Sequence, residues 1–256
     1  MTSLVVVHGS PELLAAATAA RLVTCLVDAQ AARGSASVVL TGGRTGAAVL
    51  EQVRAAPARD AVDWSAVDVY WGDERFLPAG HAERNETLAR QALLDHVPVT
   101  PSRVHTMAPA DAGLSPEEAA EQYADLLATA ARPEDDYPVP SFDVCLLGVG
   151  EEGHTASIFP DSPAVYETER SVVAVHDCPK PPPVRISLTL PTIRRAAEVW
   201  LVTTGEGKAD PVAMALGGAG EVAIPAAGAR GQRRTLWLLD SAAAAKAPGI
   251  SSVRVS

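Results

Sequence analysis

The sequence predicts an α/β fold with a mostly parallel central sheet and helices on both faces, a Rossmann-like three-layer sandwich. Short runs rich in β-branched residues alternate with amphipathic helical stretches along the chain. The 256 residues are 47% hydrophobic, which is enough for a substantial core. Because no internal repeat and no biased linker divides the chain, we expect one domain over residues 1–256.

The N-terminal part predicts a strand followed by a long helix. An apolar run at residues 4–8 indicates the strand. Ser10 can cap the helix, Pro11 suits its first turn, and Gly34 stands where a C-terminal glycine belongs. These signals, with the leucines and alanines between them, predict a helix over residues 13–33.

The later elements follow the same alternation. Each further strand is a short run rich in apolar or β-branched residues with turn residues beside it. We predict these strands at 37–41, 67–71, 142–147, 172–176, 184–189, 199–203 and 235–239. Periodic apolar residues over longer stretches predict further helices near 46–56, 84–95, 116–131 and 207–216.

Composition excludes several classes of protein. The net charge of −10 argues against general binding of nucleic acid or of an anionic membrane. The apolar runs are far shorter than the roughly 20 residues of a membrane span, and the first residues indicate a strand rather than a signal peptide. We therefore expect a cytoplasmic protein. The three cysteines match no metal spacing, so we interpret them as core residues.

A glycine turn with donors follows the strand at 37–41. In an open α/β sheet, ligands bind at the carboxyl ends of the strands. Here Thr41-Gly42-Gly43-Arg44-Thr45-Gly46 leads into a helix, so the amides of Gly42 and Gly43, with Arg44 and Thr45, can hold a phosphate. The turn lacks the lysine and the spacing of a P-loop. A plain turn between a strand and a helix is the simpler alternative.

Charged groups stand near three other strands. Trp71-Gly72-Asp73-Glu74-Arg75 places two carboxylates and a guanidinium where a strand ends. Arg185 begins an alternating strand after Lys180-Pro181-Pro182-Pro183, and Lys208 follows a glycine turn. Each cation alone is also explained as a solvated surface charge. Together with Arg44, however, the recurrence of cations at such positions predicts one pocket for an anion.

The stretch GVGEEGHTASIFP, residues 148–160, matches G-x-G-x-x-G after a predicted strand. A dinucleotide loop offers glycine amides to a pyrophosphate, which the carboxylates of Glu151 and Glu152 would repel. The stretch is therefore better interpreted as a turn that holds His154 at a strand end. A histidine there can act as a general base, with Glu152, or alternatively Glu151, as its partner. A histidine that only supports the loop is the simpler alternative.

These motifs together resemble the 6-phosphogluconolactonase family, and their order and spacing agree over essentially the whole chain. The motifs are Thr41-Gly42-Gly43, Trp71-Gly72-Asp73-Glu74-Arg75, Asn85, residues 148–160, Arg185-Ile186-Ser187-Leu188-Thr189, and Gly205 with Lys208. Two positions depart from the family's usual pattern. Glu152-Gly153-His154 replaces Asp-Gly-His, and Arg44-Thr45-Gly46 replaces a small hydroxyl residue followed by proline.

The resemblance implies a fold shared with glucosamine-6-phosphate deaminases. It also implies hydrolysis of 6-phospho-D-glucono-1,5-lactone in the pentose phosphate pathway, with a small phosphosugar lactone as ligand and no cofactor or metal. Protein partners stay unknown. The catalytic residues it implies are His154 and Glu152. The substrate-binding residues it implies are Gly42, Gly43, Arg44, Thr45, Asp73, Arg75, Asn85, Arg185 and Lys208.

The reaction and the residues agree in their chemistry. Opening a lactone needs a water activated by a base, donors for the oxyanion, and a hold on the distant phosphate. We assign the base to His154 and the phosphate to Arg44, Lys208 and the glycine amides, while Arg75 and Arg185 suit either the phosphate or the oxyanion. Two alternatives stay open: a deaminase or isomerase that uses Asp73 or Glu74 to move a proton, and a non-catalytic sugar-phosphate-binding regulatory domain.

Overall fold

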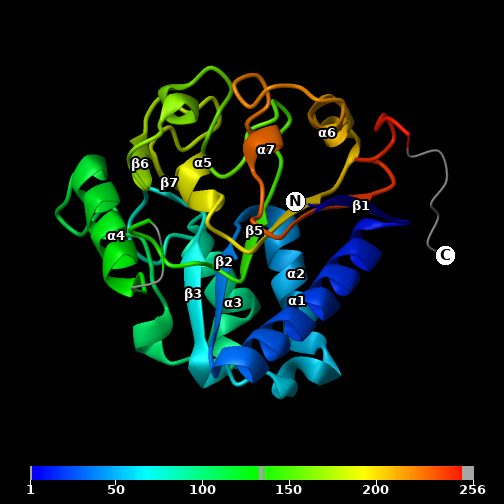
Figure 1. The fold of residues 1–256 in the computed structure, drawn as a ribbon. Coiled ribbons are helices and arrows are strands. Elements are labelled where there is room, and N and C mark those ends of the chain that lie inside the picture. Colours follow the sequence, from blue (N-terminus) through cyan, green and yellow to red (C-terminus); the bar gives the residue numbers. More distant parts are fainter. Residues whose placement is uncertain (1, 133–134, 136, 250–256) are drawn as a thin grey trace.

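The computed structural model describes residues 2–132, 135 and 137–249. A six-stranded parallel sheet in the order β1-β9-β8-β5-β2-β3 forms its centre (Figure 1). These strands are β1 (Thr2–His8), β9 (Arg234–Asp240), β8 (Glu198–Thr203), β5 (Val144–Leu147), β2 (Ala36–Leu40) and β3 (Val67–Trp71). The mostly parallel sheet that the sequence predicted is therefore confirmed.

Helices cover both faces of this sheet. The first three helices lie together on one side of it, and α5, α6 and α7 lie on the other (Figure 1). The bounds are α1 (Pro11–Arg33), α2 (Gly43–Ala55), α3 (Asn85–Ala92), α4 (Pro116–Ala130), α5 (Leu190–Ile193), α6 (Ala209–Leu216) and α7 (Pro225–Gly228). The caps of α1 are as expected: the Ser10 side chain accepts from the Leu13 amide, and Gly34 is left-handed with φ 77°.

Three strands form a second, antiparallel sheet that the sequence did not separate from the first. Its order is β4-β7-β6, with β4 (Asp73–Arg75), β7 (Arg185–Leu188) and β6 (Val172–Val175). We predicted β6 and β7 as strands but missed β4, because three residues are too few to show a period. Gly72 joins the two sheets: its N–H donates to Leu40 O at 3.0 Å, and its carbonyl accepts from the Leu188 amide at 2.9 Å.

The core is centred on the inner strands of the parallel sheet. Every residue of β5 and β8 is buried. Because the strands are parallel, the carboxyl ends of β2, β3, β5 and β8 meet at one edge of the sheet. The glycine turns after these four strands leave from this edge, so segments separated by more than a hundred residues converge there.

Candidate active site

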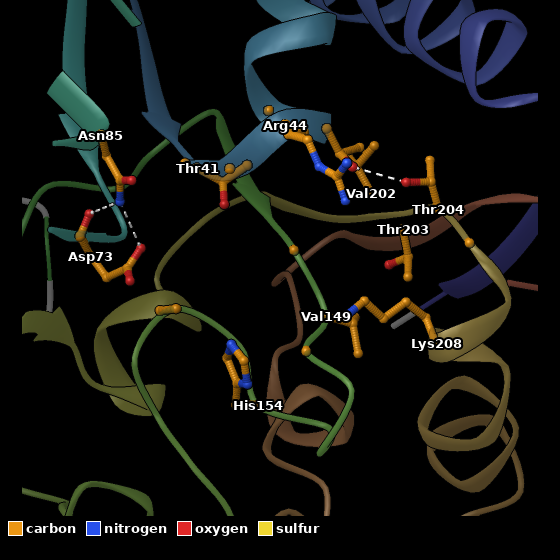
Figure 2. A pocket seen from close by; sticks show the side chains of 18 of the residues that line it. Thr41, Arg44, Asp73, Asn85, Val149, His154, Val202, Thr203, Thr204 and Lys208 are labelled. Carbon is orange, nitrogen blue, oxygen red and sulfur yellow. Dashed lines mark hydrogen bonds between the residues drawn. The ribbon is translucent and has the colours of Figure 1, made fainter. Parts of the chain in front are cut away.

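A cavity of about 740 Å³ opens at the carboxyl edge of the parallel sheet. Figure 2 shows the side chains that line it, from the β2–α2 turn, the start of α3, the loop after β5 and the loop after β8. Ten of the eleven residues predicted for the site line this cavity: Gly42, Gly43, Arg44, Thr45, Asp73, Arg75, Asn85, His154, Arg185 and Lys208. The eleventh, Glu152, contacts His154.

The N-terminus of α2 lies in the wall of the cavity. Among the described residues, no side chain caps this helix, so its first amides are available to a ligand. Arg44 in the first turn is exposed, and Thr45 Oγ1 lies 3.0 Å from Thr204 Oγ1. Gly42 packs so closely on Asn85 that a Cβ at position 42 would overlap the Asn85 amide. This turn can therefore hold an anion through backbone amides and a guanidinium.

A buried polar cluster forms the side of the cavity beside α3. Asn85 Nδ2 donates to the Asp73 carbonyl at 2.8 Å and lies 3.3 Å from Asp73 Oδ1 (Figure 2). Ser157 Oγ donates to Asp73 Oδ2 at 2.6 Å. Both carboxylate oxygens of Asp73 therefore already accept hydrogen bonds, and Asp73 joins the β3–β4 turn to the loop that carries His154.

Glu74 points away from the cavity, although the sequence placed it with Asp73. Successive side chains of a strand point to opposite faces, so Asp73 and Glu74 separate in β4. The Glu74 carboxylate accepts from the amides of Arg75, Asn85 and Glu86 at 2.7, 2.7 and 2.9 Å. Burial raises the pKa of Glu74 to about 7, although Arg84 and these amides favour its ionised form. Glu74 therefore fixes the start of α3.

The loop after β5 holds His154 against Glu152. His154 Nδ1 lies 2.8 Å from Glu152 Oε2, so Nε2 is the ring nitrogen that is not engaged by Glu152. The Gly150 amide donates to the His154 carbonyl at 2.8 Å, and a Cβ on Gly150 would overlap the imidazole ring. Gly153 has φ +87°, a conformation that side chains other than glycine rarely adopt. Of the two glutamates that the sequence left as candidates, Glu152 is the one in contact with His154.

Burial and charge set the protonation of this pair. Burial lowers the pKa of His154, and Glu152 counteracts this effect by favouring the imidazolium. Partial burial raises the pKa of Glu152, but hydrogen bonds from Lys180, from its own backbone amide and from His154 outweigh burial and lower it to about 2. The pair is therefore a neutral imidazole beside an ionised carboxylate at neutral pH.

The remaining cations are held in different ways. Arg75 donates to the Glu83 carbonyl at 2.6 Å, and Lys208 Nζ lies 3.4 Å from Glu151 Oε1. Arg185 is buried, lies 5.8 Å above the Phe159 ring, and donates to carbonyls of the loop that precedes β7. The structure therefore gathers the four predicted cations around one cavity, while Arg185 also shapes its rim.

Sequence reasoning missed some residues of the site. Lys180, Thr203 and Thr204 line the cavity, and Ser157 binds Asp73 beside it. For Lys180 the only signal was its place before three prolines, a stiff segment that holds a side chain in a fixed direction. For the threonines, the position at a strand end before a glycine turn was the available signal.

Two further observations concern the described part of the chain. It contains no group of three or more His, Cys, Asp or Glu residues that could hold a metal ion. None of its helices is both long enough and apolar enough to cross a membrane.

Comparisons with known proteins agree on one family. The family model for glucosamine-6-phosphate isomerases/6-phosphogluconolactonase matches residues 9–237. The 6-phosphogluconolactonase of Streptomyces coelicolor is 63% identical over 249 residues, which cover 96% of this chain and 95% of that protein. The solved structure of 6-phosphogluconolactonase from Trypanosoma brucei has a TM-score of 0.78 at 29% identity, over 95% of this chain and 98% of that one.

A third similarity concerns the fold alone. The structure of a monomeric glucosamine-6-phosphate deaminase has a TM-score of 0.78 at 18% identity, over 96% of this chain and 100% of that one. The fold class expected from the sequence, including its likeness to the deaminases, is thereby confirmed. On the match of the family model and the identity to the Streptomyces protein, the chain belongs to the family of glucosamine-6-phosphate isomerases and 6-phosphogluconolactonases.

Proposed function

We propose that the protein hydrolyses 6-phospho-D-glucono-1,5-lactone to 6-phospho-D-gluconate in the pentose phosphate pathway. The relatives named 6-phosphogluconolactonase support this reaction. The observation that carries it is an imidazole with a carboxylate partner in the same cavity as a helix N-terminus without a side-chain cap and several cations. The cytoplasm stays the expected location.

His154 is the general base of the proposed mechanism. With Nδ1–H donating a hydrogen bond to Glu152, Nε2 accepts a proton from a water molecule. The resulting hydroxide attacks C1 of the lactone, and the carbonyl oxygen becomes an oxyanion. When the bond between C1 and the ring oxygen breaks, the imidazolium returns the proton to that oxygen, so the products are a carboxylic acid and a hydroxyl. Glu152 stabilises the imidazolium between the two steps.

The other groups position the substrate in this proposal. Arg44, the Gly42 and Gly43 amides, and Lys208 bind the phosphate, whose fixed position orients the ring near His154. Arg75 and Arg185 are the cations available to the oxyanion. A δ-lactone already opens in water, so a base and this positioning supply the part of the rate enhancement that the reaction still needs.

A coupled assay tests the proposal. Freshly prepared 6-phosphogluconolactone is the substrate, the formation of 6-phosphogluconate is followed, and glucosamine 6-phosphate is the control substrate. We expect a rate above that of spontaneous hydrolysis with the lactone and none with the amino sugar. Turnover of glucosamine 6-phosphate alone would assign the chain to the isomerase side of its family. Binding of both compounds without turnover would indicate a regulatory domain.

A further inference from the structure

Lys180 stands between the two glutamates of the His154 loop. Its ammonium nitrogen lies 3.0 Å from Glu152 Oε1 and 3.8 Å from Glu151 Oε2. The other oxygen of Glu152 is the one that contacts His154 Nδ1 at 2.8 Å. Each oxygen of the Glu152 carboxylate therefore has its own partner, and the direction in which Glu152 faces His154 depends on Lys180.

The backbone around Lys180 is fixed by a second cation. Arg185 Nη2 donates to the Lys180 carbonyl at 3.0 Å, and Arg185 Nε donates to the Pro182 carbonyl at 3.3 Å. The Cys178 amide also donates to the Pro183 carbonyl at 3.0 Å. Because the loop is held at several points, the Lys180 side chain starts from a defined position and reaches Glu152 with little loss of conformational freedom.

The charge of Lys180 opposes that of Glu152 at the imidazole. A carboxylate in contact with a histidine favours the imidazolium, which cannot accept a proton from water. A nearby ammonium disfavours it. The charged groups that act on the ring are Glu152, Lys180 and the Asp73 carboxylate from β4, and the uncharged ring of Phe159 packs with its centroid 4.4 Å from that of the imidazole. Among these charged groups Lys180 is the cation.

We propose that Lys180 is a positioning residue that holds Glu152 against His154 and keeps the imidazole unprotonated near neutral pH. The inference rests on the proposed role of His154 as the base. Two opposite charges then act on the imidazole. The Glu152 carboxylate orients the ring and favours its protonated form, and the Lys180 ammonium disfavours that form. Lys208, by contrast, forms an ion pair with the outer glutamate, Glu151, and is proposed to bind the phosphate.

The pH dependence of kcat/KM separates this role from general support. Lys180→Met removes the ammonium but keeps the length of the side chain, and because that side chain is 39% exposed we expect the variant to fold. We expect the acidic limb of the profile to move to higher pH by roughly 0.5–1 unit. Lys180→Arg should keep the wild-type limb. The matched control, Lys208→Met, should raise KM and leave the limb in place.

A second measurement does not depend on catalysis. The His154 ring is titrated by NMR in protein labelled at histidine, with its signal assigned from its absence in His154→Asn. Lys180→Met should raise the titration midpoint of His154 by the same roughly 0.5–1 unit, whereas Lys180→Arg and Lys208→Met should not. An unchanged or lowered midpoint in Lys180→Met, or an equal shift in all three variants, would overturn the inference. This readout stands even if the lactonase assay itself fails.

Discussion

At the scale of single residues, the proposed mechanism depends on the ionisation of His154. Burial lowers the pKa of His154 from its ordinary value of 6.5, and the hydrogen bond to Glu152 opposes that shift. Because a base must be unprotonated to act, activity should be present above the pKa of His154 and should fall as the pH decreases through it. The acidic limb of kcat/KM should therefore lie below about 6.5.

Replacing His154 tests its role directly. His154→Asn keeps a polar side chain but cannot take up a proton, so kcat should fall by roughly 10²–10⁴-fold while KM changes little. Steady-state kinetics on the lactone measure both parameters, with spontaneous hydrolysis subtracted. A folded variant that keeps more than about half of its rate would show that another group is the base.

The two adjacent glutamates provide a matched pair of substitutions. Glu152 contacts His154, whereas Glu151 is exposed and its carboxylate forms ion pairs with Lys180 and Lys208. Glu152→Asp should stay active within about tenfold because the charge remains, while Glu152→Gln should lose more. Glu151→Gln should change kcat little. Greater damage from Glu151→Gln than from Glu152→Gln would mean that the wrong acid has been assigned.

At the scale of elements, the loop after β5 shapes the site through its glycines. Gly150 leaves no room for a Cβ because the His154 ring packs against it. We expect Gly150→Ala to displace the imidazole and to lower kcat by about tenfold or more, since misplacement by about 1 Å costs catalysis heavily. Gly220→Ala is the control, because a Cβ there meets open space. Kinetics of both variants, with thermal unfolding to verify the fold, decide the matter; equal kcat values would contradict the packing argument.

At the scale of the whole molecule, the parallel sheet brings together cations that lie far apart in the chain. Arg44 lies in the first turn of α2 and Lys208 directly precedes α6, and both line one cavity. Each change to Ala should weaken transition-state binding of the phosphorylated lactone by roughly 1.5–3 kcal/mol, calculated from the ratio of kcat/KM values. This is the free energy of a hydrogen bond to a charged group. The unphosphorylated lactone is the control substrate, and its kcat/KM should be almost unchanged by either substitution. Equal losses of kcat/KM on the two substrates would show that Arg44 and Lys208 do not bind the phosphate.

Metal dependence is a property of the whole protein as well. Within the described residues, no cluster of side chains has the composition of a metal site. We therefore expect activity to survive exhaustive dialysis against a chelator, measured with the same coupled assay. If activity were lost and then recovered on addition of zinc, a mechanism with a bound metal would replace the one proposed.

Much of this architecture follows from local sequence. The caps of α1, the strand at Val67–Trp71 and the glycine turns after the strands are each encoded by a few neighbouring residues, and the structure has them where the sequence indicates. The convergence of the turns after β2, β5 and β8 on one cavity also follows. Once the sheet is parallel, its strand ends must share an edge, so turns at strand ends become neighbours.

Contacts between distant segments were decided only by the tertiary structure. Short strand β4 exists because it pairs with β7, more than a hundred residues later, and this pairing alone turns Asp73 into the cavity and Glu74 away from it. The choice of Glu152 over Glu151 as the partner of His154, and the place of Lys180 beside it, also depend on how two loops pack. The sequence by itself determined which strands, turns and charged groups exist. Packing determined which charged groups touch, because their distances depend on long-range strand pairing that no local pattern records.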